Sequence, residues 1–461
     1  MSMLNHFFDY KPEVLALDEK AMELCQPYFR HMEEIRDYNQ LKMLKAFADT
    51  QMSSTDMLGT TGYGLWDTGR AKLEQIFAEV MGAEDALVRS QFQSGTHTLA
   101  VALFGLLRAG DTLLAATGRP YDTLEGVIGL DGKGKGTGTL MDYGIRYDEA
   151  PLKADFTPDY DLIAQKAPGA KVCHIQRSRG YLQRNAFDLE TIRKIADTAR
   201  AANPDIIIFV DNCYGEFTQT QEPCQMGADL VVGSLIKNPG GGIAPTGGYI
   251  AGRRDLIESC AYRLTTPGTG REIGCTLGNN RELFMGTFHA PNVTGEALKT
   301  AVFTAALFEG FGFDVTPRYD EPRADIIQAV QLREREAGAS TDTEVDPANE
   351  LTVAYHQLVN ELGVEGANEL LDKLEFHPVF TAHPTEARRK AVEGKIRRIS
   401  NLLEERPRLG GSDLVENERH MLQEIDALVR TSPIALKKPT PVEEPVREKM
   451  AVLMPIRSPS M

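Results

Sequence analysis

Short apolar runs alternate with stretches of helical pattern between residues 84 and 252. Continuously apolar strands separated by helices are typical of a mainly parallel sheet buried on both faces, so an α/β fold is expected here. Ligands bind such sheets at the carboxyl ends of the strands. The predicted strands are Ala86–Ser90, Thr112–Ala116, Lys171–Ile175, Ile206–Val210, Leu230–Ser234 and Gly248–Ala251. The predicted helices are Thr96–Arg108, Thr123–Leu130, Leu189–Ala202 and Arg254–Tyr262.

The flanking segments show other patterns. Apolar positions at helical spacing among charged ones predict an N-terminal helical arm over residues 1–54, with a role in subunit contacts. Residues 51–69 are rich in Gly, Ser and Thr and predict a loop, and residues 70–82 predict a helix that ends at Gly82. The large domain is expected to span residues 55–335.

Beyond residue 330 the pattern changes again. Residues 336–350 are polar and acidic and predict a linker. Residues 351–445 are mostly helical in pattern, with charges at i, i+4 spacing. Residues 446–461 show little periodicity and predict a loose tail. The chain is therefore expected to contain two regions of different character.

Composition narrows the class of protein. The 461 residues include 66 acidic and 50 basic side chains, a net charge of −16, which disfavours nonspecific binding to nucleic acid or anionic membranes. Six cysteines without a CxxC pair indicate free thiols in a reducing compartment, with no disulfide framework and no metal site. No signal peptide and no apolar run long enough to span a membrane is visible. A cytoplasmic, globular protein is expected.

Asp211 and Lys237 are the most informative residues. Asp211 ends a predicted buried strand in IIIFVDNCYGEF, and Lys237 follows the next strand in LVVGSLIKNPGGG. An acid and a lysine at neighbouring strand ends suit a pyridoxal phosphate site, because the lysine amine forms a Schiff base with the aldehyde. The carboxylate keeps the pyridine nitrogen protonated, so the ring can accept electrons from a substrate carbanion.

Other residues at strand ends suit the same cofactor. Ser94, Gly95 and Thr96 open a helix, where free N–H groups, hydroxyl donors and close backbone approach favour a phosphate. Ser234 lies three residues before the lysine and could reach the same phosphate, and Tyr121 is placed to stack on the ring. Each element also has an ordinary structural explanation, as an N-cap, a turn residue, a solvated charge or a core aromatic. Their common order at successive strand ends favours the cofactor.

The segment GKGKGTGT at residues 132–139 superficially suggests a nucleotide-binding loop. It lacks a preceding strand and a following helix, so we interpret it as a hairpin or a flexible loop.

Over residues 5–330 the chain resembles the pyridoxal phosphate enzymes of the methionine gamma-lyase family, also named aluminium resistance proteins, which are related to cystathionine lyases. The resemblance implies the aspartate-aminotransferase-type fold (fold type I) and an active site built in a homodimer or homotetramer. The matching segments are TGYGLWDTGRAKLEQIFAEVMGAEDALVRSQFQSGTHTLA, VDNCYGEF, SLIKNPGGGIAPTGGYIAGR and TTPGTGREIGCTLGNNRELFMGTFHAPNVTGEALKTA.

The resemblance also implies a role for each candidate residue. Lys237 becomes the Schiff-base lysine and the base that removes the substrate α-proton, Asp211 the partner of the pyridine nitrogen, and Tyr121 the stacking aromatic. Tyr63, in TGYG, is assigned to the phosphate of the partner subunit. The implied reaction is carbon–sulfur elimination from a sulfur-containing amino acid. The residues assigned to the phosphate within one subunit are Ser94, Gly95, Thr96 and Ser234.

Residues 340–445 resemble a different family, phosphoenolpyruvate carboxylase, most strongly in FHPVFTAHPTEARRKAV. That resemblance implies a catalytic role for His383 and anion binding by Arg388 and Arg389. The simpler alternative is a helix start at residues 384–386 followed by a solvated basic face. The later carboxylase segments with the metal-binding carboxylates are absent, and carboxylase chemistry needs that metal.

The small domain expected after residue 330 is not recognisable, so the chain resembles two unrelated families joined near residues 330–340. A natural fusion, a gene-model error, a truncation and a designed sequence all remain open. Three functions follow: a pyridoxal phosphate lyase, a carboxylase fragment, or a chimera that binds the cofactor with little turnover, because losing the small domain removes closure over the substrate.

Overall fold

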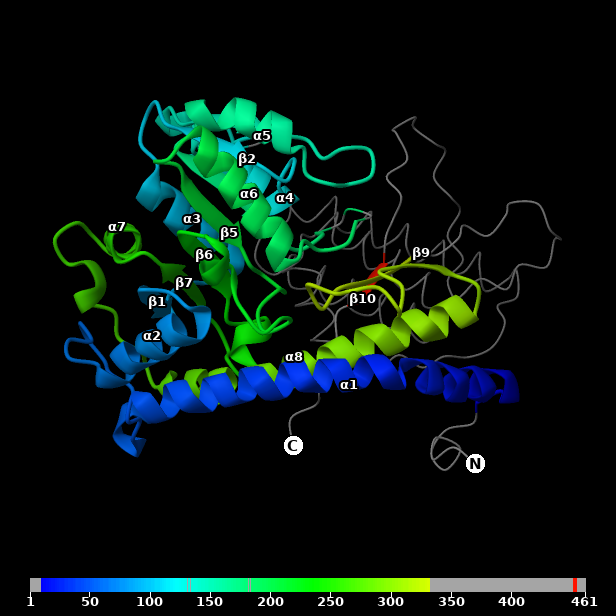
Figure 1. Cartoon of the computed structure of the whole chain (residues 1–461). Helices are drawn as coiled ribbons and strands as arrows, with labels where there is room; N and C mark the ends of the chain where they lie inside the picture. Colours follow the sequence, from blue (N-terminus) through cyan, green and yellow to red (C-terminus); the bar gives the residue numbers. More distant parts are fainter. Residues whose placement is uncertain are drawn as a thin grey trace, which may run out of the picture. The chain divides into compact units, whose positions relative to one another are not determined.

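The computed structural model describes residues 10–130, 132, 134–180, 182, 184–331 and 451–453, all within one compact unit of residues 1–333 and 449–461. This part of the chain contains a seven-stranded sheet (Figure 1). Its strands are β1 (Asp85–Arg89), β2 (Thr112–Ala115), β3 (Arg146–Glu149), β4 (Val172–Gln176), β5 (Ile207–Asp211), β6 (Leu230–Ser234) and β7 (Gly248–Gly252).

The strand order is β1-β7-β6-β5-β4-β2-β3, and within this sheet β7 runs antiparallel to both neighbours while the other pairs are parallel. The predicted α/β architecture with a mainly parallel sheet is therefore confirmed, and the six predicted strands form within one or two residues of the expected bounds. The described helices are α1 (Pro12–Asp49), α2 (Thr68–Met81), α3 (Gly95–Leu106), α4 (Asp122–Ile128), α5 (Tyr160–Lys166), α6 (Leu189–Ala202), α7 (Arg254–Leu264) and α8 (Asn280–Gly310).

Helices cover both faces of the sheet. One apolar cluster joins α3, α4 and α7 to strand residues such as Leu87 and Phe209, and the other joins α2, α5 and α6 to the alternate residues Val88 and Ile208. Successive strand side chains point to opposite faces, so a strand buried on both sides must be apolar throughout. This double burial explains why the continuous apolar runs in the sequence located the strands.

The long helices α1 and α8 lie side by side along the lower edge of the view (Figure 1). Arg36 of α1 pairs with Glu296 of α8 at 3.2 Å, and Glu33 pairs with Lys299 at 3.1 Å, so the two helices are antiparallel. The predicted N-terminal helix is thus observed over residues 12–49. None of the helices in the described ranges is long and apolar enough to cross a membrane.

A small antiparallel sheet follows α8, in the order β10-β9-β8. Its strands are β8 (Asp314–Thr316), β9 (Gln328–Gln331) and β10 (Ala451–Leu453). Residues 451–453, within the tail predicted to be loose, form strand β10, because pairing with β9 satisfies backbone groups that an edge strand leaves free. The rest of the predicted tail lies outside the described residues. The predicted linker and helical segment, residues 336–445, lie outside the described residues.

The sequence analysis did not predict helices α5 and α8 or strands β3, β8 and β9. Strand β3 has the sequence RYDE. It is a partly exposed edge strand, so its charged residues give no apolar run by which a strand would be predicted. Helix α5 is only seven residues long. Helix α8 contains Pro291, and a proline predicts the end of a helix when only the local sequence is considered. The helix nevertheless forms, and its buried face packs against α1. Tertiary packing therefore decides these elements.

Candidate functional site

A pocket of about 190 Å³ opens at the carboxyl ends of β4, β5 and β6. Asp211 is the last residue of β5 and pairs with Val232 of β6, which brings Lys237, three residues after β6, to the same edge. The pocket is lined by Tyr121, Asp122, Thr123, Gln176, Ser178, Gly180, Asp211, Cys213, Tyr214, Lys237 and Ile327. The structure thus brings three predicted site residues, Tyr121, Asp211 and Lys237, to one cavity.

The Lys237 amine lies against an aromatic ring. Its Nζ is 4.0 Å from the ring centroid of Tyr214. Burial alone would lower the pKa of this amine, but the surrounding Cys213, Tyr214 and Asp211 outweigh burial and hold the pKa above its ordinary value. The raised pKa favours the protonated form of this amine.

Asp211 is almost fully buried and is oriented by the turn that follows β5. The backbone N–H of Cys213 donates to Asp211 Oδ1 at 3.1 Å, and the Cys213 thiol is hydrogen-bonded to the same carboxylate. Burial raises the pKa of the Cys213 thiol, which keeps it protonated and able to donate. The carboxylate is thus held at the pocket wall, where a pyridine nitrogen could reach it.

The start of α3 forms a small concave space beside Lys237. Ser94 caps the helix by accepting a hydrogen bond from the His97 N–H at 3.1 Å. A Cβ built on Gly95 would lie 3.4 Å from Ser234 Cβ and 3.8 Å from Lys237 Nζ, so the missing side chain leaves room there. Ser234 Oγ is buried and has no hydrogen-bond partner in the described structure. A buried hydroxyl without a partner is costly, and a phosphate oxygen would satisfy it.

Tyr121 is held at the pocket by both its backbone and its hydroxyl. Its N–H donates to Gln176 Oε1 at 3.0 Å, and its hydroxyl lies 3.1 Å from Thr96 Oγ1. Thr96 Oγ1 also contacts Thr123 Oγ1 at 2.9 Å. Burial, together with the charge of Asp211, raises the pKa of the Tyr121 phenol, so it stays neutral. A neutral, fixed ring is suited to stacking on a flat ligand.

Several pocket residues were missed by the sequence analysis. Gln176 ends β4 and would have been found by applying the strand-end rule to every strand. Cys213 and Tyr214 lie two and three residues after Asp211, but the sequence analysis did not identify them as site residues. Ile327 lies far along the chain and gives no local signal. Its place at the pocket follows only from the path of the chain after α8.

The structure does not bring every predicted residue to this pocket. Tyr63 is 76% exposed on the loop before α2 and does not line the pocket of its own chain. Its carbonyl accepts a hydrogen bond from the Gly274 N–H at 2.9 Å, which ties the loop to residues 274–278. His383, Arg388 and Arg389 lie outside the described residues.

The glycine-rich segment 132–139 folds around a side chain of its own chain. The N–H groups of Gly136, Gly138 and Thr139 all donate to the Asp142 carboxylate at 3.0 Å. These hydrogen bonds lower the pKa of Asp142 to about 2. Backbone donors that could hold a phosphate are therefore already used, in agreement with the interpretation as a loop.

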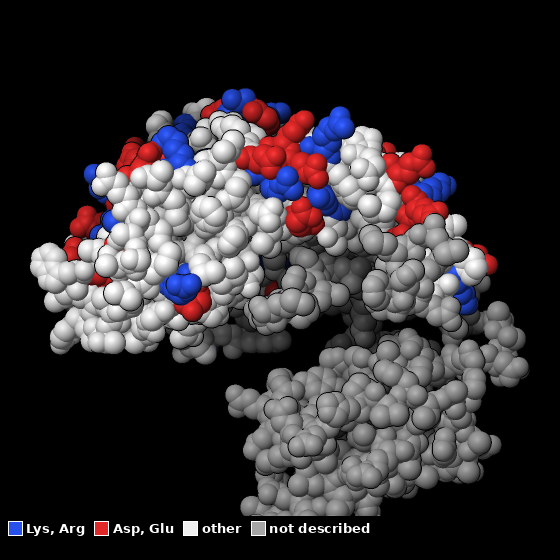
Figure 2. Space-filling model, turned by 90° about the horizontal axis from the view of Figure 1, so that it is seen from below, with Lys and Arg blue, Asp and Glu red and all other residues white. Residues whose placement is uncertain are grey.

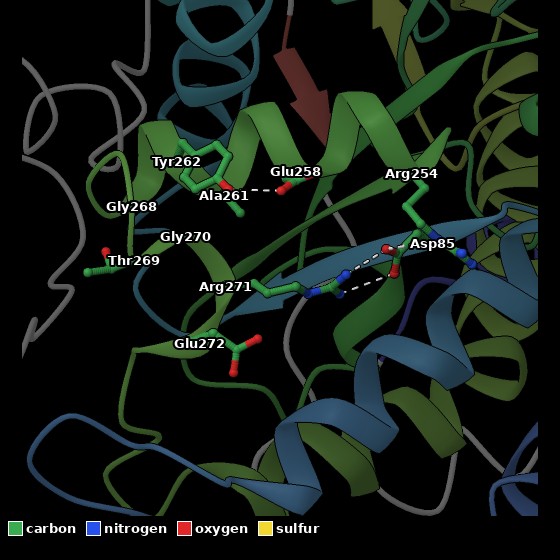
Figure 3. A pocket seen from close by; sticks show the side chains of 10 residues that line it. All are labelled: Asp85, Arg254, Glu258, Ala261, Tyr262, Gly268, Thr269, Gly270, Arg271 and Glu272. Atoms are coloured by element: carbon green, nitrogen blue, oxygen red, sulfur yellow. Dashed lines mark hydrogen bonds and ion pairs between the residues drawn. The ribbon is translucent and has the colours of Figure 1, made fainter.

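A second pocket, of about 550 Å³, lies between α7 and the loop at residues 268–272 (Figure 3). Arg271 points across it and donates to both carboxylate oxygens of Asp85, at 2.5 and 3.1 Å (Figure 3). Arg271 also donates to Glu74 at 3.0 Å. The guanidinium is thus used in fixing the loop to β1. We interpret this cluster as structural.

Known protein families match residues 14–456 of the chain. The sequence model of the methionine gamma-lyase family matches residues 14–343, and that of phosphoenolpyruvate carboxylase matches residues 324–456. Both predicted resemblances are confirmed. The uncharacterized protein YnbB of Bacillus subtilis is 47% identical over 333 residues, which cover 71% of this chain and 79% of that protein.

A solved structure of a related protein has a similar fold. The carbon-sulfur lyase involved in aluminum resistance from Clostridium novyi is 46% identical and has a TM-score of 0.69, and the match covers 71% of this chain and 78% of that one. The phosphoenolpyruvate carboxylase of Roseiflexus castenholzii is 44% identical over 77 residues, which is 16% of this chain and only 8% of that protein.

Proposed function

Because the chain belongs to the methionine gamma-lyase family, we propose that it binds pyridoxal 5'-phosphate and cleaves a carbon–sulfur bond in an amino-acid substrate. The observation that carries this proposal is the unpartnered Ser234 hydroxyl beside Gly95, which lies next to Lys237, while Lys237 and Asp211 line one pocket. A hydroxyl that can donate to a phosphate, a lysine and a buried carboxylate are the groups that this cofactor requires.

When bound, the cofactor supplies an electron sink for negative charge at the substrate α-carbon. In this proposal Lys237 attaches the cofactor, and its freed amine takes the α-proton. Asp211 holds the ring nitrogen and Tyr121 covers the ring face. The residues proposed to hold the phosphate are Ser94, Gly95, Thr96 and Ser234.

We further propose that the site is completed by a second copy of the chain. Large apolar side chains are exposed on the loop before α2 and beside the cofactor lysine, among them Tyr63, Trp66, Ile236 and Ile243. Seen from below, a broad area of the molecule carries very few charged residues (Figure 2). Exposed apolar residues on the loop before α2 and next to Lys237 favour a partner that contributes to the site, and Tyr63 is the candidate contribution.

A second candidate function is cofactor binding with little turnover. It is favoured by the end of the lyase family match at residue 343 and the start of the carboxylase match at residue 324. The segment that would close over the substrate in the lyases is then replaced. Independent carboxylase activity is less favoured, because only 8% of the carboxylase relative is matched.

Borohydride reduction after incubation with pyridoxal phosphate, followed by peptide mass mapping, tests the first proposal. We expect a phosphopyridoxyl group on Lys237 that is absent in Lys237→Ala. No label on Lys237 would refute the cofactor assignment. Release of a 2-oxo acid from L-methionine or L-cystathionine by the labelled protein would favour the lyase, and labelling without release would favour the second candidate.

A further inference from the structure

Tyr214 adopts a backbone conformation that bulky residues avoid. Its φ is +70°, in the left-handed region, although it carries a large aromatic side chain. Such a conformation is strained and persists where the surroundings impose it, most often at functional sites. Tyr214 follows Asp211 by three residues and lines the pocket.

The turn around Tyr214 is fastened from two sides. Arg177, which follows β4, donates to Asn212 Oδ1 at 2.7 Å and to the Gly215 carbonyl at 2.9 Å. Asn238, the residue after Lys237, donates to the carbonyl of Tyr214 at 3.0 Å. The same amide donates to the Glu216 carbonyl at 3.0 Å. The segment that carries the lysine is thus tied directly to the turn that carries the ring.

The consequence of this strained turn is the position of the ring. The Lys237 Nζ lies 4.0 Å from its centroid, within the range of a cation–π interaction. Asp211 and Cys213 face the amine from β5 and its turn, Tyr121 faces it from the start of α4, and Glu216 interacts with it electrostatically. Of these groups, Tyr214 contributes the aromatic face in contact with the amine.

We propose that Tyr214 is a positioning residue, whose ring holds the Lys237 ammonium in the pocket before the cofactor is attached. The inference rests on the proposed function for its purpose, while the contact itself is between two residues of this chain. The ring would keep the amine beside Gly95 and Ser234, and the amine must lose its proton before it bonds to the cofactor aldehyde.

Two variants distinguish the effect of the Tyr214 ring from the effects of its hydroxyl group and of its strained backbone. Tyr214→Phe keeps the ring. Tyr214→Asn removes it, and Asn tolerates the left-handed region, so this variant is expected to fold. Acetic anhydride labelling of the cofactor-free protein across pH, read by peptide mass mapping, reports the amine of Lys237. The exposed Lys153 in the same sample serves as the internal reference.

Removal of the ring destabilises the ammonium form, so Tyr214→Asn should label at Lys237 roughly two- to thirtyfold faster than wild type near neutral pH. Tyr214→Phe should label at the wild-type rate, and Lys153 should be unchanged in both. Equal rates in Tyr214→Asn and wild type, or an equal increase in both variants, would overturn the proposal.

If Tyr214→Asn does not fold, the contact between Lys237 and Tyr214 can be measured in the wild-type protein. The resonance of ¹³C-methylated Lys237, assigned by its loss in Lys237→Arg, should be shifted upfield by the ring, and an unshifted resonance refutes the contact. These results are independent of borohydride labelling. Failure of the Tyr214 proposal therefore leaves the cofactor proposal standing, and failure of cofactor binding leaves the amine–ring contact testable.

Discussion

Gly95 shows at the scale of the residue how a missing side chain can shape a site. Its ideal Cβ would lie 3.4 Å from both Cys213 Sγ and Ser234 Cβ, which is ordinary van der Waals distance. The chain could therefore accept a methyl group there, but the space facing Ser234 and Lys237 would be filled. In the proposed cofactor site, Gly95 is therefore needed for ligand space more than for the fold.

We expect Gly95→Ala to lower the affinity for pyridoxal phosphate at least tenfold and to change the free energy of unfolding by less than about 1 kcal/mol, because alanine suits a helix start better than glycine. Cofactor titration and urea unfolding measure the two quantities. Gly169→Ala is the matched control, since its Cβ would meet no atom within 4 Å. Unchanged affinity in Gly95→Ala would place the phosphate elsewhere.

Glu216 is a buried carboxyl with an unusual titration. Burial raises its pKa to about 8, and its Oε1 accepts a hydrogen bond from the Tyr249 hydroxyl at 3.0 Å. The folded chain therefore keeps this carboxyl protonated over a range in which the unfolded chain ionises it. Its stabilisation is complete below the ordinary pKa of glutamate and is lost as pH rises through about 8.

Glu216→Gln should remove this part of the pH dependence. Between pH 5 and 8 the wild-type free energy of unfolding is expected to fall by on the order of 3 kcal/mol more than that of the variant. Urea unfolding at the two pH values measures the difference. Parallel pH profiles would show that Glu216 ionises normally in the folded chain.

At the scale of the element, a buried ion cluster joins α2 to β1 and to the loop after α7. Glu74 of α2 accepts from Arg89 Nε at 2.8 Å and from Arg271 Nη2 at 3.0 Å. Arg89 is buried, and its other nitrogens donate to the carbonyls of residues 271 and 273. Removing the acid would leave a buried cation without its counter-charge, which is more costly than losing an exposed pair.

Glu74→Gln should therefore lower the free energy of unfolding by about 3–5 kcal/mol. The exposed Glu258, which accepts from the Tyr262 hydroxyl in the second pocket, provides the control, and Glu258→Gln should change stability by less than about 0.5 kcal/mol. Denaturant unfolding of both variants measures this contrast. Equal small effects would mean that water or other donors replace Glu74.

At the scale of the whole molecule, the exposed aromatic residues on the loop before α2 are explained by a partner that covers them. Trp66 is 90% exposed and Tyr63 is 76% exposed, both on one loop. Exposed aromatic groups on a short, glycine-containing loop are typical of interaction surfaces. This observation supports the expected homo-oligomer.

We expect the wild-type chain to sediment as a dimer or larger assembly of 50.9 kDa subunits, and Trp66→Asp to shift it toward monomers. Trp66 has a positive φ, which aspartate tolerates, so the variant should still fold. Met141→Asp, at an exposed apolar residue that opens a short 3-10 helix elsewhere on the chain, is the control. A monomeric wild type would refute the proposed assembly.

The sequence by itself determined six strands of the large sheet, most helices and the lysine–aspartate pair, because the sheet is buried on both faces and therefore has continuously apolar strands. It did not determine α8, which contains a proline, or β3, which is a charged edge strand. It also did not determine the short elements α5, β8, β9 and β10, because such short segments carry no reliable local signal. Only the tertiary structure placed Tyr214 on Lys237 and left Ser234 without a partner. Those features arise from hydrogen bonds and packing between segments far apart in the chain, which local patterns do not encode.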